Sequence, residues 1–247
     1  MNKPAADNFS RSAWRYDQFA DIQRLLQDEL INWVKQEGIY YRDILDIGCG
    51  TGRFISDLAK NFLQARIFGL DASFEMVKIS HAKTSGCVVA DAGNLPFRSN
   101  SFDLIVSNAV YQWVQDLELA FGQARGLLRP SGFFFFNCFT AKTLEGLRRC
   151  FEIETNPLPD KELVISSLSR AGFNKWEIKE RSLNKNFSDL YAILSWLKNI
   201  GANRLGHRQV FLTPARLAAL NDVYCRQHKM DKDVYANFEI IMVRARN

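Results

Sequence analysis

The fold is decided by one stretch of the chain, which reads Ile44-Leu45-Asp46-Ile47-Gly48-Cys49-Gly50-Thr51-Gly52. The mostly apolar residues at 43–47 predict a short buried strand. The three glycines predict a tight strand-to-helix turn, because glycine tolerates a left-handed backbone and lets a ligand approach closely. A helix should follow, since residues 54, 55, 58 and 62 form one apolar stripe.

The same alternation of strand and helix continues on both sides of this turn. Before it, residues 8–36 have the apolar spacing of one helix. After it we predict strands at 66–70, 87–90, 102–107 and 133–138, with helices at 73–83 and 117–128. Such alternation is typical of right-handed βαβ crossovers, and so of a parallel sheet with helices on both faces. The sequence therefore belongs to the α/β class.

The second half of the chain is organised differently. We predict helices at 160–171, 188–200 and 213–228, and strands at 175–187 and 235–246. The interpretation is one domain, 1–247, with four parts: an N-terminal helical cover (1–42), a sheet core (43–187), a late helical insertion or lid (188–230) and the last strand (231–247).

Composition narrows the class of protein. Of the 247 residues, 47% are hydrophobic and 24% are charged, as in ordinary globular proteins. There is no apolar run near the roughly 20 residues of a membrane helix, and the start has no signal-peptide core. The five cysteines form no CxxC pair, which predicts reduced thiols and no metal site. We expect a cytoplasmic protein that binds neither membrane nor nucleic acid.

Positive charge is concentrated late in the chain. Residues 148–247 hold 17 Lys and Arg against 11 Asp and Glu, whereas residues 1–147 hold 15 against 16. A solvated surface is the simpler interpretation of this excess. The alternative is a docking face for an acidic partner.

Three carboxylates lie in or at the ends of three successive strands. Asp46 lies within the first, Asp71 ends the second and Asp91 ends the third. The carboxyl edge of such a sheet is where ligands bind, so these acids are candidate ligand acceptors. Asp46 suits an ammonium group, Asp71 a pair of ribose hydroxyls and Asp91 an adenine amino group. Met76 is placed to cover an adenine face.

The spacing of the glycines separates two kinds of nucleotide site. Dinucleotide oxidoreductases have G-x-G-x-x-G, which places a pyrophosphate at the helix N-terminus. Here the spacing is G-x-G-x-G with an acid in the preceding strand. An NAD-dependent oxidoreductase is therefore the minor alternative.

Five motifs lie in order over residues 44–138: LDIGCGTG, GLDAS with EM, VVADAGNLPF, FDLIVSN and LLRPSGFF. With them the chain resembles the class I S-adenosylmethionine-dependent methyltransferases. The resemblance implies a Rossmann-like, mostly parallel seven-stranded sheet. It also implies that S-adenosylmethionine is held, without a metal, by Asp46, Gly48, Cys49, Gly50, Asp71, Ala72, Met76, Asp91, Ala92 and Asn108.

The methyl acceptor is constrained by the loop after the fourth strand. Enzymes that methylate base amino groups carry an Asn/Asp-Pro-Pro-aromatic motif there, whereas this chain has residues 107–113, Ser-Asn-Ala-Val-Tyr-Gln-Trp. A nucleic-acid base is therefore disfavoured. A small-molecule O- or C-methyltransferase, a carboxyl methyltransferase and a non-catalytic relative all remain compatible with the core.

Motifs outside the core resemble the malonyl-acyl-carrier-protein O-methyltransferases of biotin synthesis. They are RYDQFADIQ at 15–23, SN with QW at 107–113, LSWLKNIGA at 194–202 and LTP at 212–214. The resemblance implies methyl transfer to the free carboxylate of malonyl-acyl carrier protein. In the implied active site, Tyr16 lies on the N-terminal helix over the cofactor, and Trp113 lies in the loop near the acceptor. To hold the carboxylate we choose Arg204, with Lys198 as second candidate, because it follows the 194–202 motif in the predicted roof and its planar fork fixes carboxylate geometry. The acidic carrier protein then explains the basic C-terminal region, with Arg216 and Arg226 as docking residues.

Overall fold

The computed structural model describes residues 3–84, 86–152, 158–202 and 213–247. One mixed sheet organises them, with the strand order β3-β2-β1-β4-β5-β8-β6. Its strands are β1 (Asp43–Ile47), β2 (Arg66–Asp71), β3 (Cys87–Val89), β4 (Phe102–Asn108), β5 (Leu128–Phe139), β6 (Lys175–Phe187) and β8 (Asp233–Arg246). The first five are parallel, and β8 runs antiparallel to both β5 and β6. The predicted α/β class and mostly parallel sheet are confirmed. A two-residue strand, β7 (Lys229–Met230), pairs with β8 and was not predicted.

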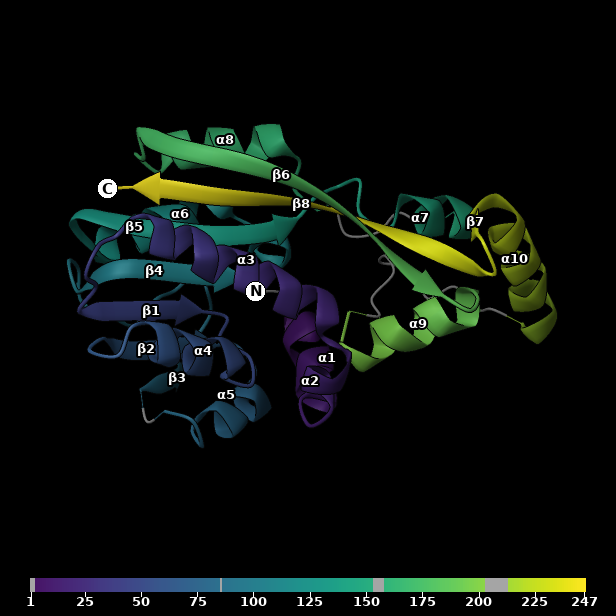
Figure 1. Ribbon diagram of the computed structural model, residues 1–247, viewed down its shortest axis with the longest axis horizontal. Helices are drawn as coiled ribbons and strands as arrows, with labels where there is room; N and C mark the ends of the chain where they lie inside the picture. Colours follow the sequence, from purple (N-terminus) through teal and green to yellow (C-terminus); the bar gives the residue numbers. More distant parts are fainter. Residues whose placement is uncertain (1–2, 85, 153–157, 203–212) are drawn as a thin grey trace.

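Helices cover both faces of the sheet (Figure 1). On one face lie α3 (Asp21–Gln36) and α4 (Arg53–Asn61), and on the other α6 (Leu117–Leu127) and α8 (Lys161–Arg170). The phenylalanines of β5 alternate between these layers, since Phe133 and Phe135 join the first core and Phe134 and Phe136 the second. All four are buried, which confirms a central strand covered on both sides.

The N-terminal cover is broken into three helices, so the prediction of one helix over 8–36 is wrong. α1 (Lys3–Ser12) and α2 (Tyr16–Phe19) precede α3, with bends at 13–15 and at Ala20. The breaks let the chain turn across the carboxyl edge of the sheet (Figure 1). Two side-chain hydrogen bonds fix it there: Ser10 Oγ lies 2.7 Å from Ser73 Oγ, and Thr51 Oγ1 donates to Asp17 Oδ1 at 2.8 Å. Tertiary contacts of this kind override helical periodicity.

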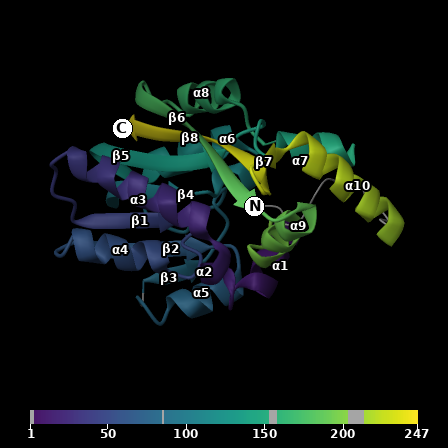
Figure 2. The same ribbon diagram turned by 45° about the vertical axis from the view of Figure 1, so that its right-hand side comes forward.

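The long hairpin β6–β8 extends beyond the rest of the sheet. β6 pairs with residues 234–246 of β8, whereas β5 pairs only with residues 240–246. The projecting half carries α9 (Leu190–Asn199), α10 (Pro214–Gln227) and α7 (Glu145–Phe151) (Figures 1 and 2). α9 and α10 fall within the predicted insertion at 188–230. Its function as a lid stays a prediction.

The projecting helices also contact the N-terminal cover. Trp196 on α9 donates its indole N–H to the carbonyl of Phe19 at 2.8 Å. At the end of α9, Gly201 has φ +76°, and a Cβ there would lie 2.7 Å from Ser12 Oγ. Glycine is therefore required both by the backbone angle and by the close approach of α1. These contacts close a space between cover, sheet edge and α9. Among the described residues, no helix has the length and apolarity needed to cross a membrane.

Candidate active site

The turn between β1 and α4 forms the floor of the first cavity. Its glycines at 48, 50 and 52 all have positive φ, from 52° to 77°. At Gly48 a Cβ would lie 2.1 Å from a methyl group of Val110, so no larger residue fits without displacing the loop after β4. At Gly50 the space above the backbone is open. The turn therefore offers bare backbone to a ligand, as the sequence predicts.

Asp71 is held rigidly at the end of β2. Its Oδ2 accepts the backbone N–H of Gly50 at 3.0 Å, and its Oδ1 accepts that of Ser73 at 2.8 Å. Burial raises the pKa of this carboxyl, and the backbone N–H groups of Ser73, Gly50 and Ala72 act in the opposite direction. Each oxygen keeps a further lone pair, so the oriented carboxylate can accept two hydroxyl groups of a ribose.

Asp46 is the most unusual group beneath the loop. Its side chain is buried, and both carboxylate oxygens lack a hydrogen-bond partner. Burial, with Cys87 and Asp71 nearby, raises the pKa of Asp46 well above its usual value. Buried carboxylates are almost always paired, so this one fits a site that a cationic ligand completes. An amino acid ammonium group is such a cation.

The glycine-loop cavity, lined by the turn and by the ends of β2 to β4, brings most of the predicted cofactor residues together. Its lining includes Gly48, Gly50, Asp71, Ala72, Met76, Ala92 and Asn108. Asp91 lies between lining residues 90 and 92, and its Oδ1 accepts the N–H of Gly93 at 2.7 Å. Cys49 lines a smaller side cavity on the α3 side of the turn, next to Gly50 and Thr51. Its thiol lies 4.0 Å from the Cys87 thiol and from the Ser80 hydroxyl, so only its backbone is suited to a ligand.

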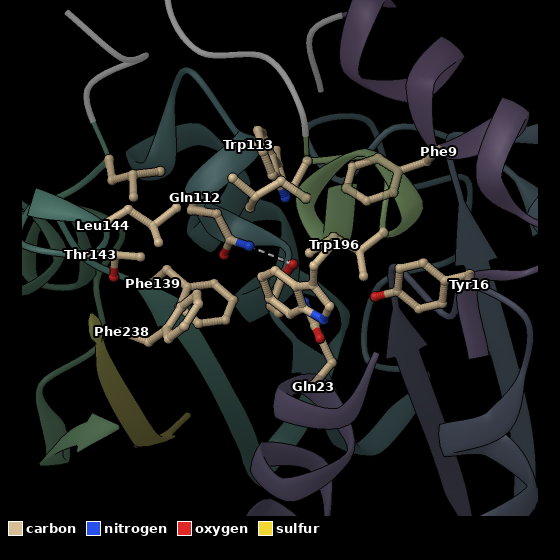
Figure 3. A pocket seen from close by; sticks show the side chains of 15 residues that line it. Phe9, Tyr16, Gln23, Gln112, Trp113, Phe139, Thr143, Leu144, Trp196 and Phe238 are labelled. Atoms are coloured by element: carbon tan, nitrogen blue, oxygen red, sulfur yellow. Dashed lines mark hydrogen bonds between the residues drawn. The ribbon is translucent and has the colours of Figure 1, made fainter. Parts of the chain in front are cut away.

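Figure 3 shows the residues that line a second space, the aromatic cavity. Phe9, Tyr16, Ala109 and Trp113 line both, so the two cavities share one wall. The aromatic cavity encloses about 810 Å³ of empty space, open solvent at its mouth included. The rest of its lining is Gln23, Gln112, Phe139, Thr143, Leu144, Leu158, Trp196, Leu197, Ile200, Ala202 and Phe238. None of the described lining residues carries a charge.

Tyr16 and Trp113 stand in the shared wall, as expected of an active site. The ring of Phe9 packs edge-to-face against both, at centroid distances of 6.3 Å to Tyr16 and 5.6 Å to Trp113. Burial, with Asp71 and Asp17 nearby, raises the pKa of the Tyr16 phenol, so its hydroxyl is a hydrogen-bond donor at neutral pH. Trp113 ends a short 3-10 helix at Tyr111–Trp113.

Of the two predicted cations, the structure describes only Lys198. Lys198 is exposed in the last turn of α9 and does not line the aromatic cavity. Arg204 lies outside the residues that the structure describes, so its role in holding a carboxylate stays a prediction. The described residues contain no cluster of His, Cys, Asp or Glu suited to a metal.

Sequence reasoning missed much of the aromatic cavity. The omitted lining residues include Phe9, Gln23, Gln112, Phe139, Trp196 and Phe238. Three of them lie inside motifs that were already recognised: Gln23 in RYDQFADIQ, Gln112 in the loop at 107–113 and Trp196 in LSWLKNIGA. No pattern marks Phe238, which faces the cavity only because β8 projects beyond the sheet.

Comparison with known proteins places this arrangement in a family. Residues 45–136 match the family described as a methyltransferase domain. The malonyl-[acyl-carrier protein] O-methyltransferase of Methylococcus capsulatus is 30% identical over 246 residues, covering 95% of this chain and 90% of the relative. The Geobacter sulfurreducens enzyme of that name is also 30% identical, covering 78% of this chain and 79% of the relative.

Solved structures agree on the fold at low sequence identity. The YcgJ protein of Bacillus is 14% identical with a TM-score of 0.64, covering 89% of this chain and 98% of its own. Haemonchus contortus phosphoethanolamine N-methyltransferase 2, in complex with S-adenosyl-L-methionine, is 17% identical with a TM-score of 0.61, covering 96% of this chain and 57% of its own. The chain is thus a class I S-adenosylmethionine-dependent methyltransferase, and it belongs to the malonyl-[acyl-carrier protein] O-methyltransferase family.

Proposed function

We propose that this protein methylates the free carboxylate of malonyl-acyl carrier protein. The product, a malonyl methyl ester, would be extended by fatty-acid synthesis as an ordinary primer on the way to the pimeloyl group of biotin. The observation that carries the proposal is the aromatic cavity, whose described lining is uncharged and which shares the wall of Tyr16, Ala109 and Trp113 with the glycine-loop cavity.

The glycine-loop cavity fits the cofactor. Asp71 offers two oriented oxygens to a ribose, and Met76 offers an apolar surface to an adenine. Asp46 is not in the lining of this cavity but lies buried beneath the loop, where its unpartnered carboxylate would attract an ammonium group. When bound, S-adenosylmethionine supplies an electrophilic methyl group on a sulfonium. The shared wall brings an acceptor in the aromatic cavity next to that methyl group.

Methylation of a carboxylate requires no acid–base catalysis by the protein. A carboxyl group with a pKa near 4 is already ionised at neutral pH, so no general base has to remove a proton. The chain's part is to align a carboxylate oxygen with the methyl group and to exclude water. An apolar wall of Phe139, Trp196 and Phe238 suits both tasks, because a poorly solvated carboxylate is the better nucleophile.

A transfer assay tests the proposal. The purified protein is given S-adenosylmethionine with malonyl-acyl carrier protein, malonyl-coenzyme A, free malonate or acetyl-acyl carrier protein, and S-adenosylhomocysteine formation is measured. We expect turnover with malonyl-acyl carrier protein, a base-labile methyl ester as product, and none with the acetyl thioester. Turnover of unrelated small molecules without any malonyl thioester would contradict the proposal.

The docking of the carrier protein gives a separate prediction. Arg216 and Arg226 are exposed on α10, within the basic C-terminal region. Reversing both to Glu should raise KM for malonyl-acyl carrier protein roughly tenfold and weaken its salt dependence, because acidic partners are attracted by charge. Activity on malonyl-coenzyme A should change little.

The matched control reverses two cations far from α10. Arg170 and Lys175 are exposed, on α8 and at the start of β6. Their double Glu variant has the same net charge as the first. Steady-state kinetics at low and at high salt compare the two. If both variants raise KM equally, net charge rather than a docking face is responsible.

A further inference from the structure

The described lining of the aromatic cavity contains few polar side chains, and three of them already hydrogen-bond the protein. Gln112 Nε2 donates to the carbonyl of Ala109 at 2.7 Å. Thr143 Oγ1 donates to the carbonyl of Glu239 at 2.9 Å and accepts its N–H at 3.0 Å. The indole N–H of Trp196 donates to the carbonyl of Phe19. These three donors serve the fold. The amide oxygen of Gln112 is buried without a partner, but an amide oxygen only accepts hydrogen bonds and so does not suit a carboxylate.

Gln23 is different. It lines the aromatic cavity and also the side cavity at the glycine turn, so it stands where the two spaces meet. Its amide oxygen is buried and has no hydrogen-bond partner, and among the described residues its amide nitrogen donates to none either. The orphan oxygen only accepts hydrogen bonds, but the N–H groups of this amide, which bond no described residue, remain available as donors to a ligand.

The backbone of Gln23 is fixed by a hydrogen bond to Asn108, which lines the glycine-loop cavity. Asn108 Nδ2, at the end of β4, donates to the carbonyl of Gln23 at 3.0 Å, and Asn137 Nδ2 donates to Asn108 Oδ1 at 2.8 Å. The side chain therefore starts from a rigid point on α3. Figure 3 shows the Gln23 side chain and the Tyr16 hydroxyl directed toward the same part of the cavity.

We propose that Gln23 orients the acceptor carboxylate, by donating an amide N–H to the oxygen that is not methylated. The inference rests on the proposed function. Gln23 would act with the Tyr16 hydroxyl as a neutral clamp. The two lie on different helices, α3 and α2, and both line the aromatic cavity.

A neutral donor suits this reaction better than a cation. A cation lowers the nucleophilicity of the carboxylate, and it loses its partner when the carboxylate becomes an ester. The oxygen bound by an amide N–H becomes the ester carbonyl, which still accepts that hydrogen bond. The donor is therefore satisfied before and after transfer, and no buried charge is left unpaired.

Two substitutions at Gln23 separate orientation from packing. Gln23→Leu removes the donor at similar volume and should lower kcat/KM for malonyl-acyl carrier protein by roughly 10- to 30-fold, the scale of one hydrogen bond to a charged group. Gln23→Glu places a second carboxylate beside the first and should lower it further under mildly alkaline conditions. Both variants should bind S-adenosylhomocysteine like wild type, measured by calorimetry.

The pH dependence provides a readout that a structural role would not change. As the pH is lowered from mildly alkaline to mildly acidic, the carboxyl group introduced by Gln23→Glu takes up a proton and becomes a donor. The ratio of the kcat/KM of this variant to that of Gln23→Leu should therefore rise as the pH falls. Gln18→Leu and Gln18→Glu are the controls, because Gln18 lines none of the three cavities.

The experiments distinguish a failure of the proposed function from a failure of the proposal for Gln23. If the wild type does not methylate malonyl-acyl carrier protein, the proposed function and this inference fall together. If the wild type is active and the Gln23 variants equal it, or if the ratio does not change with pH, only the inference is overturned. A loss of S-adenosylhomocysteine affinity as large as the loss of kcat/KM also overturns it and assigns Gln23 to the cofactor.

Discussion

Replacing Asp71 by Ala is expected to weaken S-adenosylhomocysteine binding by roughly three orders of magnitude. Two ribose hydroxyls would lose a charged acceptor, and each such hydrogen bond contributes about 1.5–3 kcal/mol. The glycine turn would also lose the acceptor for the N–H of Gly50. Isothermal titration calorimetry measures the affinity. Asp71→Asn, which keeps one acceptor oxygen, should give an intermediate loss.

The control for Asp71 is a carboxylate that also accepts a backbone N–H but lines none of the three cavities described above. Asp116 caps α6, and its Oδ1 accepts the N–H of Leu119 at 2.9 Å. Asp116→Ala should leave S-adenosylhomocysteine affinity unchanged. Wild-type affinity in Asp71→Ala would mean that the end of β2 does not hold the ribose.

Replacing Asp46 by Asn is expected to lower cofactor affinity by about two orders of magnitude, because the cofactor ammonium loses a buried negative partner. The effect should depend on pH. Since burial raises the pKa of Asp46 in the free protein, protons compete with the ammonium group, and wild-type affinity should fall as the pH is lowered through that raised pKa. Calorimetry over a pH series should show this slope in the wild type and not in Asp46→Asn.

The stability of the ligand-free protein should change with pH in the opposite sense. A carboxyl whose pKa is higher in the folded than in the unfolded state binds more protons when folded. Its stabilising contribution is complete below the unfolded pKa, about 4, and is lost as the pH rises through the folded value. Denaturant unfolding should show this component in the wild type and its loss in Asp46→Asn. An identical pH dependence in both proteins would show that Asp46 is not the titrating group.

The sheet core was predictable because its signals are local. The glycine turn and the short apolar strands specify their own structure, and βαβ handedness fixes how they assemble. The break between α1, α2 and α3 was not predictable, since residues 8–36 keep helical spacing across it. It depends on long-range contacts such as Ser10 with Ser73, and no periodicity records those.

The candidate site also has one part that the sequence predicts and another that it does not. Asp71 and the glycines occupy positions that strand ends dictate, so sequence could place them. The aromatic cavity is assembled from the N-terminal cover, the loop after β4, the region around 139–144, α9 and the projecting end of β8. Residues such as Phe9 and Phe238 meet there from opposite ends of the chain. Their side chains are ordinary core aromatics in sequence, and only tertiary packing makes them part of a site.

The position of β8 between β5 and β6 also bears on how the protein is made. During synthesis on the ribosome, residues 43–139 can pair five strands as they emerge, because each neighbours one already formed. β6 then emerges without a partner and waits for β8, the last of the described strands. Until residues 233–246 leave the exit tunnel, β5 and β6 both present an unpaired edge, the kind of surface on which nascent chains aggregate. Truncation within β8 should therefore lower the yield of folded protein more than the number of removed residues suggests.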